Sequence, residues 1–167
     1  MTATHTIIDT QIGELTLVAA GGVLTGVYYP GHWTNPDRTA FGPLSDEGFD
    51  EAGRQFGEYL AGERTAFELR TSATGDTFQQ RVWALLNRIP YGETTTYGEL
   101  ARELGDPALA RMVGRAVGSN PLSVVVPCHR VLGKDGKLTG YAGGLERKRF
   151  LLELERLPVM AEAARLF

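Results

Sequence analysis

Apolar and polar positions alternate over short stretches in the first thirty residues of the chain. Residues 5–9 (HTIID), 14–20 (ELTLVAA) and 23–29 (VLTGVYY) are rich in β-branched and aromatic side chains, and a Gly-Gly pair separates the last two. Short stretches of this kind, bounded by turn residues, are typical of antiparallel β-strands. We therefore predict a small sheet at the N-terminus, to which residues 66–70 (AFELR) can add one more strand.

Helical spacing replaces the alternation after a loop rich in Pro, Gly, Asn and Asp. Residues 46–60 carry Phe49 and Phe56 on one side and several acids at their start, which favours a helix. Residues 78–89 (FQQRVWALLNRI) repeat apolar positions at the same period, with Asp76 as a capping residue before them and a proline after them. Both stretches are predicted to be amphipathic helices.

Two shorter helices follow. Thr96 and Glu99 form a T-x-x-E capping box that opens the first of them, over residues 97–104 (YGELAREL). The second, over residues 107–118 (PALARMVGRAVG), begins with a proline behind a capping aspartate. Two short helices joined by a turn that contains Gly form a helix-turn-helix, a pattern that many proteins without DNA contacts share.

The rest of the chain completes an α/β fold of the α+β type. Residues 122–126 (LSVVV) are predicted to be a buried strand, residues 132–138 (LGKDGKL) a hairpin turn, and residues 145–157 a final amphipathic helix. We expect residues 1–74 to form an N-terminal α/β domain, a small sheet with one helix. Residues 75–167 are expected to form a mainly helical C-terminal domain that contains the helix-turn-helix.

Composition narrows the possible classes of protein. With 167 residues, 43% of them apolar and 22% charged, the chain has the make-up of an ordinary globular protein. No apolar stretch approaches the ~20 residues of a membrane-spanning helix, and the N-terminus lacks the basic and apolar regions of a signal peptide. A single cysteine cannot form an internal disulfide, which favours a reducing compartment. We therefore expect a cytoplasmic protein with no membrane partner.

Charge is distributed unevenly along the chain. Residues 1–80 hold 4 Lys and Arg against 11 Asp and Glu, whereas residues 81–149 hold 11 against 6. A basic segment inside a chain whose net charge is −3 is consistent with nucleic-acid binding. A cluster of charges is also, more commonly, just a solvated surface.

The only cysteine, Cys128, is followed directly by His129 in the stretch VVVPCHRV. A free thiol with a pKa of ~8.5 is less than ~10% thiolate at neutral pH, so a nucleophilic cysteine needs a base. A histidine oriented by a carboxylate supplies one, and Glu153 and Glu155 are the candidate acids. Because neighbouring side chains diverge on an extended chain, contact requires a backbone turn or a bridging water. A buried structural cysteine fits these residues equally well.

The second helix of the helix-turn-helix has an unusual composition, because Arg111 and Arg115 project from a surface of small residues. These small residues are Ala108, Ala110, Gly114, Ala116 and Gly118. Glycine in a helix costs ~1 kcal/mol relative to alanine, so two of them indicate a packing or binding reason. Small side chains permit close approach to a partner, and arginines reach phosphates or a groove.

Two tyrosines and two histidines are further candidates for site residues. Tyr97 and Tyr141 each lie beside a glycine, which suits either a pocket that stacks on a base or simple packing. His5 and His32 have no Cys or carboxylate at ligand spacing, so no metal site is predicted.

Four stretches of the second half resemble the O6-alkylguanine-DNA alkyltransferases, also called methylated-DNA–protein-cysteine methyltransferases. They are TFQQRVWALLNRIPYGETTTYGELA, RMVGRAVGSNP, VVVPCHRV and GKLTGYAGGLERKRFLLELE, between residues 77 and 155. The first 75 residues resemble the N-terminal domain of that family only in layout. The resemblance implies a DNA repair protein without a cofactor. It would transfer the alkyl group of O6-alkylguanine, and of O4-alkylthymine, in duplex DNA irreversibly to Cys128, once per molecule.

The resemblance also implies roles for single residues. His129 would act as the base through a water, Glu155 would be the acid behind it, and Asn120 would fix the turn around Cys128. Tyr97 would protonate or hydrogen-bond the departing guanine. Arg111 would enter the duplex where the flipped nucleotide had been, with its helix in the minor groove. The residues implied in DNA contact are Arg111, Thr96, Ala110, Gly114 and Arg115. Those implied in the substrate pocket are Tyr141, Ala142, Gly143 and Val131.

The sequence departs from the pattern of the family at three positions. Ala142 stands where some members carry a serine that can contact O6, Met112 replaces the usual alanine after Arg111, and Leu109 is bulkier than the common alanine. These changes affect substrate preference and the fit to the groove. The partner implied is double-stranded DNA containing O6-alkylguanine, bound by a monomer that can bind side by side with other copies.

Three alternative functions remain for comparison. A sensor of alkylated guanine with the same fold would replace the cysteine, whereas Cys128 is present. A transcription regulator would need a polar, base-reading second helix in place of PALARMVG. A Cys-His hydrolase would turn over repeatedly and would have no need of Arg111 or of the basic segment.

Overall fold

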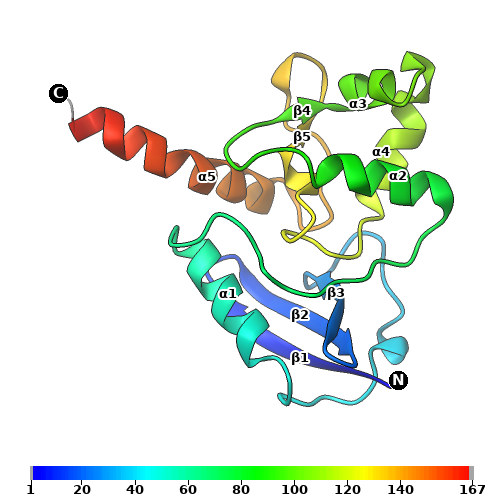
Figure 1. Ribbon diagram of the computed structural model, residues 1–167, viewed down its shortest axis with the longest axis vertical. Helices are drawn as coiled ribbons and strands as arrows, with labels where there is room; N and C mark the ends of the chain where they lie inside the picture. Colours follow the sequence, from blue (N-terminus) through cyan, green and yellow to red (C-terminus); the bar gives the residue numbers. More distant parts are fainter. Residues whose placement is uncertain (1, 166–167) are drawn as a thin grey trace.

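The computed structural model describes residues 2–165, with side-chain burial described up to residue 156. The chain opens with an antiparallel sheet in the order β1 (Ala3–Thr10), β2 (Gly13–Ala20) and β3 (Val23–Tyr28). Helix α1 (Asp50–Leu60) lies along this sheet (Figure 1), and its Phe56 packs in the same core as Leu15 and Leu17 of β2. The predicted sheet with one helix is confirmed.

Two elements predicted for this half differ in the structure, one in its start and one in its presence. Helix α1 begins at Asp50 rather than Asp46, because Gly48 has a φ of 85° and the Asp46 carboxylate accepts a hydrogen bond from the Thr6 hydroxyl at 2.7 Å. The predicted strand over residues 66–70 is wrong. The backbone N–H of Glu68 donates to the Gln55 side chain at 2.8 Å instead of to a strand, and only Thr71 forms a bridge to the sheet.

The second half is built from helices around a two-stranded parallel ladder of β4 (Thr95–Thr96) and β5 (Val131–Leu132). Its helices are α2 (Thr77–Leu86), α3 (Tyr97–Glu103), α4 (Ala110–Gly118) and α5 (Leu145–Arg165). Short 3-10 turns cover Arg38–Phe41 in the first half, and Pro107–Leu109, Cys128–Arg130 and Lys134–Gly136 in the second. Helices α3 and α4 form the predicted helix-turn-helix.

The caps predicted from the sequence set the starts of these helices. The Asp76 carboxylate accepts from Gln79 N at 2.8 Å and the Gln79 side chain accepts from Asp76 N, so that α2 opens with a complete capping box. At α3 only half of the predicted box forms. The Thr96 hydroxyl accepts from Glu99 N at 3.1 Å, whereas the Glu99 carboxylate accepts from the hydroxyl of Thr95. Helix α2 ends three residues earlier than predicted, in a turn before Pro90.

The predicted strand over residues 122–126 is wrong as well, and the difference shapes the site. Val125 N donates to Ser123 O at 2.9 Å across Val124, whose φ is 72°. This is a γ-turn of the rare, strained kind, and a positive φ in a β-branched residue costs about 1–3 kcal/mol. Cys128 N donates to Val126 O at 2.7 Å in a second tight turn. An apolar run that reads as a strand therefore folds into consecutive turns.

One hydrophobic cluster includes side chains from both halves of the chain, among them Leu17, Val27, Val113 and Leu151. Val27 N donates to Pro121 O at 2.8 Å, so β3 is joined directly to the segment that precedes Cys128. The domain boundary near residue 74 stays a prediction and lies in the segment between α1 and α2. No helix in the part of the chain that the structure describes is long and apolar enough to cross a membrane.

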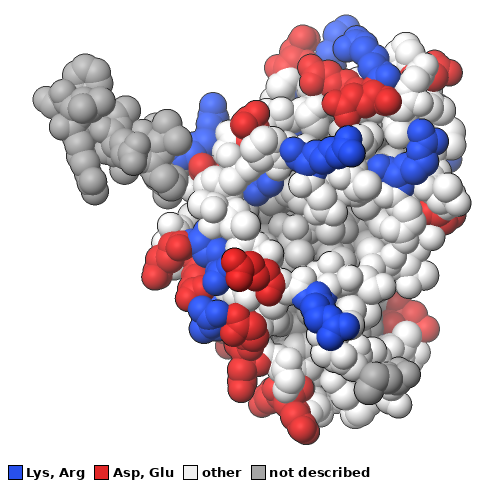
Figure 2. Space-filling model, in the orientation of Figure 1, with Lys and Arg blue, Asp and Glu red and all other residues white. Residues whose placement is uncertain are grey.

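Figure 2 shows how the uneven charge of the sequence is laid out on one face. Asp and Glu, with a few Arg, gather over α1, whereas the upper part formed by the second half carries Lys and Arg beside Asp and Glu. The acidic excess of the first half is therefore visible over α1, while both signs of charge are mixed over the second half on this face.

Candidate active site

The turn that carries Cys128 is held by one buried amide. Asn120 Nδ2 donates to Val126 O at 2.9 Å, and Asn120 Oδ1 accepts from Leu122 N at 2.9 Å. Asn120 is only 2% exposed, and a buried amide needs hydrogen-bond partners. Its two bonds take the place of the sheet hydrogen bonds that residues 122–126 lack. The structure thus places Asn120 where it fixes the position of Cys128.

Cys128 is buried and lines a cavity of about 20 Å³. A volume of this size holds about one water molecule, since one probe sphere occupies roughly 10–15 Å³. Burial raises the pKa of the Cys128 thiol, and the Asn120 amide and the Lys148 ammonium oppose this effect without cancelling it. The resting group is therefore a protonated thiol, which needs a base before it can act as a nucleophile.

His129, the candidate base, lies in a buried polar network with Glu155. Residues 128–130 form a 3-10 turn, so the backbone bends where an extended chain would have separated the two side chains. His129 Nε2 lies 2.6 Å from Glu155 Oε2, and Arg130 Nε donates to Glu155 Oε1 at 2.8 Å. The Tyr59 hydroxyl also donates to Glu155. Burial alone would raise the pKa of Glu155, but the bonds from His129, Arg130 and Tyr59 lower it to about 2.

These bonds determine the protonation of His129. The ionised Glu155 carboxylate only accepts hydrogen bonds, so the proton of the imidazole lies on Nε2. Burial lowers the pKa of His129 and outweighs the opposite effect of Glu155, so the ring is neutral at pH 7. Its Nδ1 carries a free lone pair and has no hydrogen-bond partner among the described residues. A buried acceptor of this kind is a natural site for a bound water.

Lys148 is a site residue that the analysis of the sequence missed. Its side chain is buried, and its Nζ donates to Thr139 O at 2.6 Å. Burial lowers the pKa of Lys148 to about 8, and the nearby Cys128 opposes this. The signal in the sequence was its spacing, because Lys148, Leu151 and Glu155 recur along the buried face of α5. A lysine at such a position needs a partner, which here is the loop beside Cys128.

The two tyrosines predicted for the pocket both lie at the cavity beside Cys128. Tyr141 is buried, and its hydroxyl lies 2.6 Å from the hydroxyl of Tyr29 in the first half. The Tyr97 hydroxyl accepts a weak hydrogen bond from Thr139 at 3.5 Å. Burial raises the pKa of Tyr97 and of Tyr141, so both phenols keep their protons at neutral pH.

Of the other residues predicted for the substrate pocket, one lines the cavity and two lie outside it. Ala142 lines the cavity with the tyrosines. Val131 is buried in β5, opposite Thr95, and does not line it. Gly143 also lies outside the cavity, and a Cβ there would come within 2.6 Å of the Tyr29 ring, which explains the glycine by packing.

A groove of about 630 Å³ runs along α4 next to this cavity. Of the residues predicted to contact DNA, it is lined by Arg111, Arg115, Ala110 and Gly114. A Cβ at Gly114 would find its nearest neighbour, Tyr97 Cδ1, at 3.9 Å, so no packing inside the protein requires a glycine here. Thr96 does not line the groove but caps α3. The helix therefore presents small residues and two guanidinium groups along one hollow.

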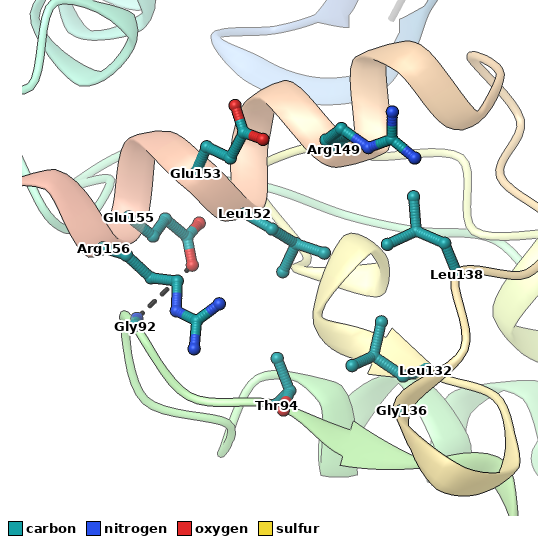
Figure 3. Close-up of a pocket in the computed structure, with 10 residues that line it drawn as sticks. All are labelled: Gly92, Thr94, Leu132, Gly136, Leu138, Arg149, Leu152, Glu153, Glu155 and Arg156. Carbon is teal, nitrogen blue, oxygen red and sulfur yellow. Dashed lines mark hydrogen bonds between the residues drawn. The ribbon is translucent and has the colours of Figure 1, made fainter.

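A second cavity, of about 440 Å³, opens between α5 and the loops that contain Gly92 and Gly136 (Figure 3). Glu155 and Gly92 lie on its wall, joined by a hydrogen bond of 3.4 Å from Gly92 N to Glu155 Oε1. Cys128 does not line it, so this cavity gives no access to the thiol. Among the side chains that the structure describes, no group of three or more His, Cys, Asp or Glu is arranged to hold a metal ion.

Comparison with known proteins gives one consistent result. Residues 77–157 match the family described as "6-O-methylguanine DNA methyltransferase, DNA binding domain". The methylated-DNA–protein-cysteine methyltransferase of Mycobacterium tuberculosis is 51% identical over 157 residues, which cover 89% of this chain and 90% of the relative. This chain belongs to the methylated-DNA–protein-cysteine methyltransferase family. The Haemophilus influenzae member is 41% identical over 155 residues, covering 92% of this chain and 87% of its own.

Solved structures of methyltransferases agree with the fold over nearly the whole chain. The crystal structure of Mycobacterium tuberculosis O6-methylguanine methyltransferase has a TM-score of 0.85 and 48% identity, covering 93% of this chain and 94% of that one. The structure of Mycobacterium tuberculosis OGT in complex with DNA has a TM-score of 0.86 at 48% identity, covering 92% and 93%. The resemblance and the α+β fold class inferred from the sequence are confirmed.

Proposed function

We propose that Cys128 of this methyltransferase accepts the alkyl group of O6-alkylguanine, and of O4-alkylthymine, from duplex DNA in a single turnover. The observation that carries the proposal is the position of the thiol. Cys128 lies in a cavity that shares Tyr97, Gly114 and Gly118 with the groove along α4, and the next residue in the chain, His129, is paired with Glu155. A base turned out of a duplex in this groove would enter the cavity with its O6 edge towards the sulfur.

The reaction is one displacement at carbon. The thiol proton passes through a water to His129 Nδ1, and the sulfur attacks the alkyl carbon while the bond from that carbon to O6 breaks. The electron pair of that bond leaves with guanine, which takes up a proton. The products are a thioether at Cys128 and unmodified guanine. Nothing in the reaction removes the alkyl group from sulfur, so each molecule acts once.

His129 is suited to be the base because its Nδ1 lone pair has no hydrogen-bond partner among the described residues and can accept a proton. Protonation creates an imidazolium, which the Glu155 carboxylate stabilises through Nε2. Arg130 and Tyr59 hold Glu155 in place and keep it ionised. The network therefore keeps one tautomer ready and supports the charge that forms during transfer.

Tyr97 supports the departure of guanine. Its pKa is raised by burial, so its hydroxyl carries a proton and can donate it, or a hydrogen bond, to the base that leaves. Tyr141 and Ala142 also line the cavity. With Ala142 in place of a serine, contacts to O6 fall to backbone N–H groups in the same loop. Gly143 and Val131 support this pocket from outside, through Tyr29 and β5.

The groove along α4 is proposed as the DNA contact. Arg111 is exposed at the start of α4 and fills the space that the flipped nucleotide leaves. Arg115 binds the backbone, Ala110 and Gly114 permit close approach to a minor groove, and Thr96 contacts phosphate beside α3. The protein acts as a monomer in the reducing cytoplasm, where its thiol stays free. Further copies can bind the same duplex side by side.

The deciding experiment is intact mass spectrometry after mixing the protein with a duplex that contains one O6-methylguanine. We expect the mass to rise by one methylene unit, mapped to Cys128 and limited to one per molecule, with a parallel reaction on O4-methylthymine duplex. The Cys128→Ala variant should bind the same duplex with native affinity and gain no mass. Tight binding to the lesion without an adduct would instead indicate a sensor of alkylated guanine, and adduct formation on Cys128→Ala would refute the role of the thiol.

A further inference from the structure

One exposed aromatic side chain covers the cavity beside Cys128 although it comes from the other half of the chain. Trp33 lies in the loop that follows β3, and the residue is 55% exposed. The indole Nε1 donates to Gly118 O at 3.0 Å, and Trp33 N donates to Ala142 O at 3.2 Å. Both acceptors belong to residues that line the cavity.

Two glycines make room for this indole. A Cβ on Gly118 would come within 2.5 Å of Trp33 Cζ2, and a Cβ on Gly140 within 3.1 Å of Trp33 Cη2. Any larger residue at Gly118 would push the ring away from its present position. The ring therefore fits between α4 and the loop that carries Tyr141, and it spans the two walls of the pocket.

The indole also lies where the two hollows that a base must pass through meet. Trp33 lines both the open groove along α4 and the cavity at Cys128. The groove measures about 630 Å³ and the cavity about 20 Å³. A space for about one water cannot hold a purine, so some part of the lining must move before the base reaches the sulfur. Val117, Asn120 and Tyr141 are buried and held by their neighbours, whereas the indole of Trp33 is the large exposed part of this lining.

We propose that Trp33 is the gate of the alkylguanine pocket. In the free protein its indole closes the cavity over Cys128, and it turns aside to admit the base, so that it limits both access and the size of the alkyl group. The proposal rests on the proposed function for the identity of the substrate. The loop itself stays in place, because buried His32 accepts a hydrogen bond from Tyr29 N and stacks on the Tyr29 ring. Rotation of the side chain breaks only the bond from Nε1 to Gly118 O.

The test compares Trp33→Ala and Trp33→Phe with a neighbouring control, Thr34→Ala, which changes a residue that lines the groove but not the cavity. The first measurement is the rate at which iodoacetamide alkylates Cys128, the only thiol, and it needs no DNA. If the gate is open in about one molecule in ten, its removal raises the rate about tenfold. Trp33→Phe keeps an aromatic ring but loses the N–H donor, so an intermediate rate is expected. Thr34→Ala should react like the native protein.

The second measurement is the single-turnover rate with the free base O6-benzylguanine and with O6-methylguanine in duplex DNA. Trp33→Ala should speed the reaction with the large free base more than the reaction with the duplex, whose binding energy helps to open the gate. Iodoacetamide rates that are equal in Trp33→Ala and the native protein, with both folded by circular dichroism, would overturn the gate. A slower reaction of Trp33→Ala with the free base would also overturn it. Absence of alkyl transfer by the native protein would instead refute the proposed function and leave the iodoacetamide result to decide the gate.

Discussion

Glu155 Oε2 lies 2.6 Å from Nε2 of His129, and both side chains are almost completely buried. A charged carboxylate in such a place is stable only because His129, Arg130 and Tyr59 all bond to it. Because the imidazole proton lies on Nε2 in this contact, the free lone pair of the ring lies on Nδ1. One contact therefore serves both the stability of the C-terminal half and the chemistry proposed for Cys128.

Glu155→Gln should slow alkyl transfer and destabilise the fold. The amide removes the negative charge that supports the imidazolium, so we expect the single-turnover rate to fall about 100-fold. Arg130 would be left as a buried cation without its anion, which costs about 3–5 kcal/mol in the free energy of unfolding. Urea denaturation and quenched-flow transfer assays measure the two effects, with Glu153→Gln on the exposed side of α5 as the control. Equal behaviour of the two variants would contradict the network.

Acid unfolding should report the same carboxylate. The folded pKa of Glu155 is about 2, below its usual value of 4.5, so this group stabilises the fold above pH 4.5 and the stabilisation is lost as the pH falls towards 2. The shift corresponds to about 3 kcal/mol. The free energy of unfolding, measured from pH 5 to pH 2, should fall more steeply for the native protein than for Glu155→Gln. Parallel curves would show that other groups dominate.

Lys148→Met should reduce the reactivity of Cys128. The ammonium is the cation that favours the thiolate, and its Nζ also holds Thr139 O, so we expect transfer to slow about tenfold. Lys134→Met removes an exposed lysine and serves as the control. The check is the pH dependence of Cys128 alkylation, where the midpoint should move to higher pH in Lys148→Met alone. An unchanged midpoint would leave Lys148 a packing role only.

Arg111→Ala should affect duplex DNA far more than the free base. The guanidinium is proposed to fill the space of the flipped nucleotide, a step that free O6-benzylguanine does not need. We expect the rate on O6-methylguanine duplex to fall about tenfold or more and the rate on the free base to stay within about twofold. Arg81→Ala, at an exposed position on α2, controls for the loss of one positive charge. Equal losses on both substrates would refute the role of Arg111.

Methylation of Cys128 should lower the stability of the protein. The cavity beside the sulfur measures about 20 Å³, so a methyl group must displace a water or push its neighbours apart. Overpacking of this kind costs about 1–3 kcal/mol, and each kcal/mol lowers the Tm of a chain of this size by about 2–4 °C. Differential scanning calorimetry before and after reaction with alkylated duplex, with the Cys128→Ala protein as control, measures the change. An identical Tm would show that the pocket relaxes around the adduct.

Interactions between residues close in the sequence explain which parts of the fold could be predicted from it. The alternation in residues 3–28 and the caps at Asp76 and Thr96 act over a few neighbouring residues, and the predicted sheet and helix starts follow from them. The prediction of a strand over residues 122–126 was wrong because a short apolar run of β-branched residues favours a strand. Its turns are imposed by Asn120, whose amide reaches Val126 O, and by the positive φ of Val124.

In the site, too, some residues could be predicted from the local sequence and others depend on tertiary packing. The order Pro127-Cys128-His129-Arg130 alone marked the thiol and its neighbour, and the resemblance to a family added the acid. From the residues themselves Glu153 and Glu155 were equally good, since both lie on one helix. They are ~200° apart around its axis, and only the packing of α5 on the turn at Cys128 decides that Glu155 faces inward.

The sequence by itself determined the N-terminal sheet, most helices and their starts, and the presence of one reactive motif, because these depend on short-range periodicity and local hydrogen bonds. The tertiary structure alone decided the partners that come from far along the chain. Tyr59 of α1 bonds to Glu155, Lys148 of α5 bonds to Thr139 O, and Trp33 from the loop after β3 lines the cavity of Cys128. No periodicity encodes such contacts, since they depend on how the helices and the sheet pack around a shared core.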